Sequence, residues 1–432
     1  RIRYCSSSSS SLKNGQQDVC NILPRDVIQI AWALGTMESD NVYLGDALVH
    51  LVDAINEYWI DNSSQGGRPL AKWTCADLVQ MATALAHGRL DNQSALAAVY
   101  KESLDRLQMN GTKKRKRTEI FSTREISILL WVQARLYLMP KYGDVYGDFP
   151  GVASRVLLQR MEGENSSKKG RGNQLFSATT MRNKGLGLQE QANLAWSLTV
   201  LENYNNDDIV MLLQNIFHAA SSNYEEGNTI QLEHAHQLWQ SYFLLSKDCP
   251  ACVQFVPSQF SEFLERKWNI EKGRTKTSSS RHKAISQTLD LMRVAHRNEY
   301  DEDVDVAIVL DEDSAWTHMA LEDDFEHCFT DDEDSNILCE GKKNQWKKVA
   351  VEFDGPHHFT VMPTTDDMLA TTSPAIPRVL GHTVLKYRLL KKKGWTVVRI
   401  PYFEFDKIPF WASMERQRYL QRALKTHDKI EF

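Results

Sequence analysis

Three acidic residues on two predicted strands have the types and the spacing for an oxygen-rich site. Glu352 and Asp354 stand two residues apart in the apolar stretch 348–354, which predicts a strand. Side chains two apart on a strand leave the same face, so both carboxylates point in one direction. Asp305 lies in a second predicted strand, 304–310, and would join them if the two strands pair. Three converging carboxylates suit Mg²⁺, which could polarise a phosphate and lower the pKa of an attacking water.

Cationic and imidazole side chains that could contact a phosphate follow the second of these strands. His357 lies in the Gly-Pro-His-His turn that ends the strand, and a predicted amphipathic helix at 383–393 concentrates positive charge. Phosphate contacts give salt-dependent affinity for nucleic acid. We expect these contacts to come from His357, Lys386, Arg388, Lys391, Lys392, Lys393 and Arg399. The alternatives are a solvated surface for the helix, a structural hydrogen bond for His357 and a capped turn at Asp354.

The elements that must position these residues form a small α/β domain. The pattern predicts helix, strand, strand, helix and strand, at residues 286–294, 304–310, 348–354, 383–393 and 395–401. Gly394 ends the second helix, as glycine commonly does. An acidic insert at about 311–345 separates the first two strands. We expect the insert to loop out of the domain, where it aids solvation or deters nonspecific anions.

Ahead of this domain, five predicted helices share one sequence phrase. An acidic residue opens each phrase, where it favours the positive end of a helix. The phrases begin at Asp26, Asp77, Glu125, Glu190 and Glu233, and six positions later four of them carry Trp32, Trp131, Trp196 and Trp239. Offsets of 51, 48, 65 and 43 residues match two-helix units, which indicates an α-helical repeat solenoid with insertions. The tryptophans either fill the core between repeats or stack bases from a concave face.

Charge is distributed unevenly along the 432 residues, although the net charge is only −5. Residues 299–335 carry sixteen acidic and no basic side chains, which leaves +4 for residues 1–298 and +7 for residues 336–432. The net charge therefore does not argue against a nucleic-acid partner, because the two other segments are basic. No stretch approaches the roughly 18 to 20 apolar residues of a membrane span, so we expect no membrane partner.

The C-terminal sequence resembles a known family, the RAP domain. The resemblance is carried by Val-Ala-Val-Glu-Phe-Asp-Gly-Pro-His-His-Phe at 349–359 and by the run 381–402, which includes Gly-Trp-Thr-Val-Val-Arg-Ile-Pro-Tyr. It covers about residues 349–408. RAP domains end many organellar RNA-binding proteins in which helical repeats precede them, including FAST-kinase-domain proteins of mitochondria and octotricopeptide-repeat proteins of algal plastids. The resemblance implies RNA contact by this domain and a fold similar to restriction-endonuclease-like nucleases.

The chain departs from the nuclease pattern at one position. Asp354 stands where the Glu-x-Lys pattern of those nucleases has its lysine, so activation of a water would depend on Lys386. A metal-dependent endoribonuclease is therefore the second hypothesis, with Asp305, Glu352 and Asp354 as catalytic residues and as ligands of Mg²⁺. No cofactor is required for RNA binding alone. A helical-repeat scaffold that grips a partner protein is the third hypothesis.

These observations predict the organisation and the role of the chain. We expect a disordered tail or transit-segment remnant at 1–24, the repeat array at 25–270, a linker at 275–280, the RAP region at 281–410 with its core at 349–408, and a C-terminal helix at 411–432. The protein is expected to bind single-stranded organellar RNA, with other RNA-processing proteins as further partners, and to act in RNA processing, stability or splicing. The mitochondrial matrix is the expected location and the chloroplast is the alternative.

Overall fold

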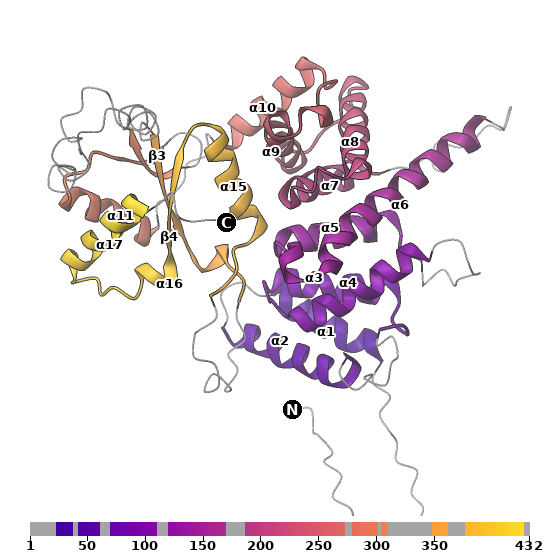
Figure 1. Ribbon diagram of the computed structural model, residues 1–432, viewed down its shortest axis with the longest axis horizontal. Coiled ribbons are helices and arrows are strands. Elements are labelled where there is room, and N and C mark those ends of the chain that lie inside the picture. The colour runs from indigo at the N-terminus through magenta and orange to yellow at the C-terminus, as the bar shows by residue number, and fades with distance from the viewer. Residues whose placement is uncertain are drawn as a thin grey trace, which may run out of the picture.

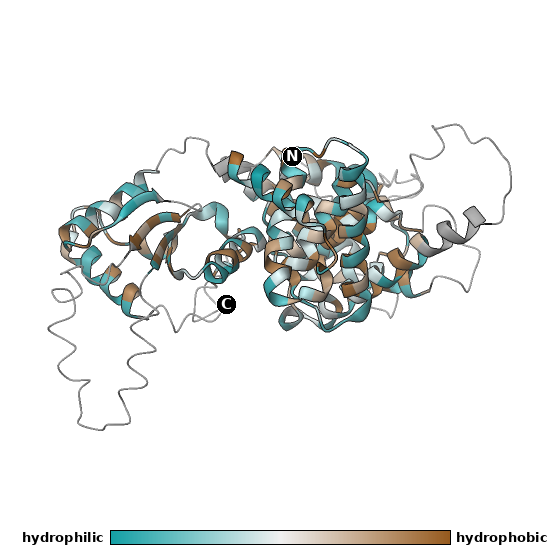
Figure 2. Ribbon diagram, turned by 90° about the horizontal axis from the view of Figure 1, so that it is seen from above, coloured by the Kyte–Doolittle hydropathy of each residue, from teal (hydrophilic) through white to brown (hydrophobic). Residues whose placement is uncertain are grey.

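The computed structural model of this chain describes residues 23–37, 42–60, 70–109, 120–169, 186–272, 279–300, 304–309, 348–361 and 376–426. Parts of the predicted organisation lie outside these ranges, namely residues 1–22 of the tail, 275–278 of the linker, the acidic insert 311–345, residues 362–375 of the RAP core and the last residues, 427–432. The described residues form a helical array and a smaller α/β body beside it (Figures 1 and 2). None of the described helices combines the length and the apolar character that a membrane crossing requires.

The array consists of two rows of helices (Figure 1). The first row holds one helix for each sequence phrase: α1 (Pro24–Thr36), α3 (Cys75–His87), α5 (Thr123–Arg135), α7 (Leu188–Leu201) and α9 (Leu232–Asp248). Each of them packs against the next. The helices between them are α2 (Val42–Ile55), α4 (Gln93–Gln108), α6 (Asp144–Lys169) and α8 (Asp207–Glu225), and α10 (Ser258–Lys272) packs on α9. The helical N-terminal region is thus consistent with repeats.

The acidic residue that opens a phrase caps its helix in two of the repeats. In α3 the Thr74 hydroxyl accepts a hydrogen bond from the Asp77 amide at 3.1 Å, and the Asp77 carboxylate accepts one from the Thr74 amide at 2.8 Å. Ser122 and Glu125 form the same reciprocal pair at the start of α5. Such a cap contributes about 1 kcal/mol, because it satisfies backbone amides that have no partner within the helix.

The four tryptophans of the phrases differ in exposure along the array. Trp196 and Trp239 lie in the core, at 7% and 5% exposure, whereas Trp131 is half-buried and Trp32 is 43% exposed. The core between repeats therefore accommodates the two C-terminal members of the row. The two N-terminal members keep part of their rings in solvent.

The α/β body is built on a mixed four-stranded sheet in the order β1-β2-β3-β4. Its strands are β1 (Arg297–Tyr300), β2 (Val304–Val309), β3 (Lys348–Asp354) and β4 (Thr396–Pro401). Strands β1, β2 and β3 pair antiparallel in turn, and β4 pairs parallel to β3. A parallel pair needs a crossover, which contains α15 (Gly381–Lys392). Strand β1 was not predicted from the sequence.

Helices cover both faces of this sheet (Figure 1). On one face α11 (Ser280–Leu291) and α17 (Ser413–Thr426) pack on alternate residues of the strands, such as Val349, Val351 and Phe353. The other face carries Ala350 and Val397, and α15 covers it with Tyr387 and Leu390. A short helix, α16 (Tyr402–Phe405), follows β4. Within the range predicted for a C-terminal helix, 411–432, α17 spans Ser413–Thr426, and residues 427–432 lie outside the described part of the chain.

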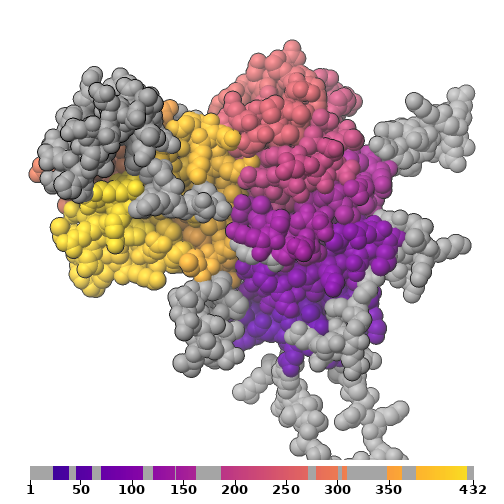
Figure 3. All heavy atoms as spheres, in the orientation of Figure 1, coloured from indigo at the N-terminus to yellow at the C-terminus, as the bar shows by residue number. Residues whose placement is uncertain are grey.

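Helix α15 also joins this body to the repeat array. Leu380, Leu385 and Leu389 belong to the same apolar cluster as the array helices, and α15 packs against α5, α7 and α9. Figure 3 shows the atoms of the C-terminal body directly against those of the array. At Gly381 the two backbones approach so closely that a Cβ atom would lie only 1.9 Å from the Ala134 carbonyl oxygen. Glycine is thus the residue that permits this contact.

Substitution of Gly381 tests whether α15 holds the two bodies together. Gly381→Ala drives a methyl group into the backbone of α5, so we expect it to destabilise the protein by about 1–3 kcal/mol in chemical unfolding. Gly45→Ala is the matched control, because a Cβ atom at that position in α2 has no neighbour within 4 Å. It should leave the stability unchanged or raise it by up to about 1 kcal/mol. Equal stabilities for the two variants would contradict the close packing at Gly381.

Candidate functional site

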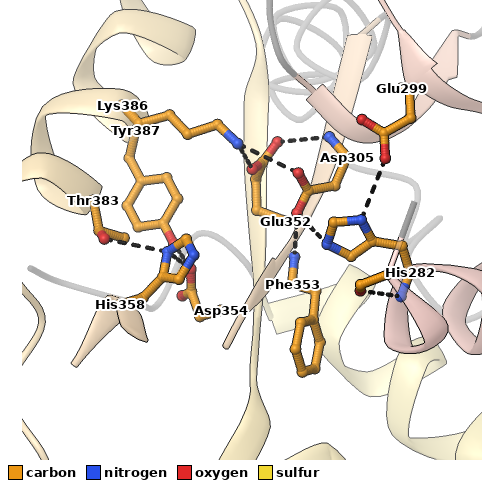
Figure 4. A network of polar contacts seen from close by, with 11 residues as sticks. His282, Glu299, Asp305, Glu352, Phe353, Asp354, His358, Thr383, Lys386 and Tyr387 are labelled. Atoms are coloured by element: carbon orange, nitrogen blue, oxygen red, sulfur yellow. Dashed lines mark hydrogen bonds and ion pairs between the residues drawn. The ribbon is translucent and has the colours of Figure 1, made fainter. Parts of the chain in front are cut away.

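Two of the three predicted acidic residues, Asp305 and Glu352, meet where the two central strands pair. The antiparallel register pairs Val306 with Val351, which brings Asp305 beside Glu352. The Asp305 amide donates to Glu352 Oε1 at 3.2 Å, and the Phe353 amide donates to Asp305 Oδ2 at 3.0 Å. Figure 4 shows both carboxylates on the side of the sheet that α15 covers. The predicted pairing of the Asp305 and Glu352 strands is thereby observed.

Lys386 of α15 lies against these two carboxylates. Its Nζ is 2.5 Å from Glu352 Oε2 and 3.4 Å from Asp305 Oδ1 (Figure 4). Burial lowers the pKa of Lys386, but the negative charges of Glu352 and Asp305 outweigh it and raise that pKa above its usual value. Burial also raises the pKa of Glu352, with the charge of Lys386 opposing it. The raised pKa of Lys386 favours its protonated form, which disfavours a role as general base.

His282, which the sequence analysis did not select, completes this network from α11. Its Nε2 is 3.2 Å from Asp305 Oδ2, and its Nδ1 is 3.4 Å from Glu299 Oε1 of β1. The hydrogen bond to Asp305 raises the pKa of His282, against the effect of burial. For Asp305, burial opposes ionisation, but His282 and the charge of Lys386 lower the pKa below its usual value. The spacing of His282 from the apolar Ile285 and Leu289, three and seven residues on, would have placed it on the buried face of its helix.

Asp354 forms a second, separate set of contacts. Arg399 of β4 donates to its Oδ2 from Nε and from a terminal nitrogen, both at 2.8 Å, and the Tyr387 hydroxyl donates to Oδ1. His358 Nδ1 lies 3.6 Å from Asp354 Oδ1. Burial raises the pKa of Asp354 to about 6, although the charge of Arg399 opposes this. The guanidinium of Arg399, a predicted RNA contact, is thus engaged with the protein and lies 4.8 Å from the Tyr387 ring.

The arrangement of these carboxylates does not fit a bound Mg²⁺. Within the described residues, no group of three or more His, Cys, Asp or Glu side chains is placed to hold a metal ion. The oxygens of Glu352 and Asp305 face Lys386, His282 and backbone amides, and those of Asp354 face Arg399 and Tyr387. A cation at these oxygens would have to displace positive side chains that already neutralise them. The site is therefore a closed set of ion pairs.

Most of the predicted basic face of α15 lies against the array. Arg388 donates to the Thr199 carbonyl at 2.6 Å and to the Asp248 carboxylate at 2.8 Å, and Lys392 pairs with the same carboxylate. Lys393 Nζ lies 5.2 Å from the centre of the Trp239 ring. Of the remaining predicted contacts, His357 and Lys391 are exposed. Arg388 and Lys392 thus bind the array, and His357 and Lys391 lie at the surface.

The sequence of this body matches one known family. Residues 351–423 are found to be a RAP domain, which confirms the resemblance seen in the sequence. The match includes Glu352, Asp354, Lys386 and Arg399, whereas Asp305 precedes it in the chain. RAP domains are a family associated with RNA binding. The chain therefore carries an RNA-binding-associated domain docked on a helical array.

The pair of His282 and Asp305 is expected to stabilise the protein within a limited pH window. Because the pKa of His282 is raised, its contribution is complete below about pH 6.5, the value in an unfolded chain, and is lost as the pH rises through the folded pKa. Because the pKa of Asp305 is lowered, its contribution is complete above about pH 3.9 and is lost as the pH falls through the folded value. Asp305→Asn should therefore destabilise the protein most between about pH 4 and 6.5.

Measurement of the histidine itself gives the sharper test. An NMR titration of His282 should show a pKa above about 6.5 in the wild type and a lower value in Asp305→Asn. A wild-type His282 pKa at or below about 6.5 would contradict the pairing.

Proposed function

We propose that this protein binds single-stranded RNA in an organelle and acts in the processing, stability or splicing of transcripts. The observation that carries the proposal is the RAP domain at residues 351–423, docked through α15 along the helical array. Helical repeats present side chains at regular intervals, which suits an extended single strand. The mitochondrial matrix is the proposed location and the chloroplast is the alternative. Other RNA-processing proteins are proposed as further partners.

The charge distribution supports an RNA ligand for the C-terminal body. Residues 336–432 carry a net charge of +7 and residues 1–298 carry +4, while the acidic charge is concentrated at 299–335. A polyanion would therefore meet positive charge on the RAP domain, whereas the array at residues 25–270 has 24 basic and 27 acidic side chains, a net charge of −3. Several of these charges are neutralised internally, as at Arg388 and Lys386, so exposed cations must supply the contacts with phosphate.

RNA binding and its salt dependence test this proposal. We expect a labelled single-stranded RNA to bind the full chain, and three or four phosphate contacts would make the affinity fall about 20- to 50-fold between 50 and 200 mM salt. Fluorescence anisotropy across a salt series measures this. A double-stranded RNA of the same sequence is the control and should bind more weakly, because its bases are not accessible. Absence of binding, or an affinity that salt does not change, would contradict the proposal.

A metal-dependent endoribonuclease is the second function to test, because one observation favours it. Lys386 lies at Glu352 and Asp305, so a lysine does reach the carboxylates although Asp354 replaces it in the strand. The restriction-endonuclease-like fold that the sequence suggests would place catalytic residues in this region. Against this function stands the neutralisation of each carboxylate by a cationic side chain, and we derive no reaction from the site.

A cleavage assay decides between binding and hydrolysis. We expect a labelled single-stranded transcript to remain intact when it is incubated with the protein and Mg²⁺, because the carboxylates are engaged in ion pairs. Wild type, Glu352→Gln and Lys386→Met should give the same result, and Lys407→Met, at an exposed position, serves as a control. Mg²⁺-dependent cleavage that is lost in Glu352→Gln and Lys386→Met but kept in Lys407→Met would establish the nuclease instead.

A further inference from the structure

Two cysteines, Cys249 and Cys252, lie one turn apart where α9 ends in the array. Cys249 follows Asp248, the last residue of α9, and Cys252 ends the short 3-10 helix η6 (Pro250–Cys252). The Cys252 thiol donates a hydrogen bond to the Cys249 sulfur, and the two sulfurs are 3.4 Å apart. Both cysteines are free thiols, and we call this pair the α9 dithiol. Two thiols in direct contact are a candidate for oxidation to a disulfide.

The backbone between the two cysteines is compatible with such a bond. The Cys252 amide donates to the Cys249 carbonyl at 3.0 Å, which closes a turn. A turn of this kind holds its first and last Cα atoms within about 7 Å, and disulfides join Cα atoms about 4.4–6.8 Å apart. Gln214 of α8 donates to the Ala251 carbonyl at 3.0 Å and supports the turn from the neighbouring helix. The sulfurs have to approach from 3.4 Å to about 2.0 Å, which requires rotation about side-chain bonds.

The two thiols differ in their access to solvent. Cys249 is half-buried and is followed by two exposed residues, whereas Cys252 lies in the core of the array at 0% exposure. Burial, and then the contact with Cys249, raise the pKa of the Cys252 thiol to about 12. A cysteine reacts as a thiolate that the reagent can reach. Cys249 is therefore the thiol that a reagent from solvent meets first, and Cys252 reacts second, with a group already attached to Cys249.

The α9 dithiol adjoins a contact that holds the two bodies together. Asp248 directly precedes Cys249 and accepts from Arg388 of α15 at 2.8 Å. Lys392 of α15 pairs with the same carboxylate, and α9 packs on α15 (Figure 1). The Cys249 amide donates to the Leu245 carbonyl at 2.9 Å, so Cys249 also closes the last turn of α9. A constraint on Cys249 is thus a constraint on the end of α9 that meets the RAP domain.

We infer that the α9 dithiol is a modification site that a low-molecular-weight disulfide, such as glutathione disulfide, oxidises to an internal disulfide. The Cys249 thiolate attacks one sulfur of glutathione disulfide, the bond between its two sulfurs breaks, and the departing glutathione thiolate takes up a proton. Cys252 then loses its proton and attacks the Cys249 sulfur of the mixed disulfide, which forms the internal bond and releases a second glutathione thiol. The two cysteines are oxidised and glutathione disulfide is reduced. The raised pKa of Cys252 slows the second step, but its sulfur already touches its target.

The internal bond is expected to stabilise the docking of the RAP domain. A disulfide restricts the conformations that the turn can adopt when the end of α9 opens. The turn then holds Asp248 beside Arg388 and Lys392 for a larger fraction of the time. This effect is the same whether or not RNA is the ligand, because neither cysteine is assigned a contact with RNA.

Peptide mapping of the full chain tests the modification. Trypsin cuts after Lys247 and after Arg266, and the peptide between these sites contains Cys249 and Cys252 but no other cysteine. After incubation with glutathione disulfide and trapping of free thiols with N-ethylmaleimide, we expect this peptide to carry no maleimide and to have lost two hydrogen atoms. Dithiothreitol should restore the reduced peptide. A peptide that keeps both thiols, or that stops at a mixed disulfide with glutathione, would overturn the inference.

Single variants identify the role of each thiol. Cys252→Ala retains the half-buried thiol and should stop at a mixed disulfide of Cys249 with glutathione. Cys249→Ala retains only the buried thiol, so its peptide should remain unmodified. The reverse result would contradict the order of the two steps. If a variant does not fold, the wild-type peptide map still decides whether the internal disulfide forms.

Amide hydrogen exchange shows whether the bond affects the docking contact. In the oxidised wild type the amides of α15 should exchange about threefold or more slowly than in the reduced protein. Helix α4, in the other row of the array, is the internal control and should exchange at the same rate in both forms. Unchanged exchange in α15, with the disulfide fully formed, would overturn the link to docking.

Discussion

Helix α15 is packed on two sides, and the rest of the structure depends on this. Leu385 and Leu389 face the array, and Tyr387 and Leu390 face the sheet. Residues four apart lie on one side of a helix, whereas residues two apart lie nearly opposite each other, so the two pairs point in opposite directions. A helix that is apolar on both sides has to be buried on both sides. The RAP domain and the array consequently share one helix, and neither completes its packing alone.

This shared helix explains how the charged residues are arranged. On the array side Arg388 meets Asp248, and on the sheet side Lys386 meets Glu352 and Asp305. Charges that leave water are costly unless a partner of opposite sign and further hydrogen bonds replace the solvent. Lys386 and Arg388 both satisfy this condition. Their positive charge therefore contributes to the orientation of the two bodies and is not available to a ligand.

The burial of charged residues on α15 changes where RNA is expected to bind. A helix with five cationic residues predicts a phosphate-binding surface, but burial converts part of that surface into an interface. Among the cationic residues of this helix, Lys391 and Lys392 are the ones with exposed side chains, although Lys392 also pairs with Asp248 of the array.

Local and long-range features differ in how far the sequence alone determined them. Helical periodicity, the acidic residue at each phrase and the two-residue spacing of Glu352 and Asp354 are local properties, and they predicted the array helices and the strands β2, β3 and β4. The resemblance to the RAP domain also needed only the sequence, because it depends on residue types in order. Helix α6 was not predicted from the sequence, because Pro150 interrupts its helical pattern. In the structure, packing against α4 and α8 stabilises this helix.

Tertiary structure alone decided which charged residues meet. Arg388 and Asp248 are 140 positions apart, and Arg399 reaches Asp354 only because β4 pairs with β3. The local sequence at Arg388 or at Asp248 does not show that the charge will be neutralised, since this pairing depends on how α15 is oriented between the two bodies. The sequence thus determined most of the elements, the RAP domain and the residues that carry charge. The packing of α15 decided which of those charges hold the protein together and which face the solvent.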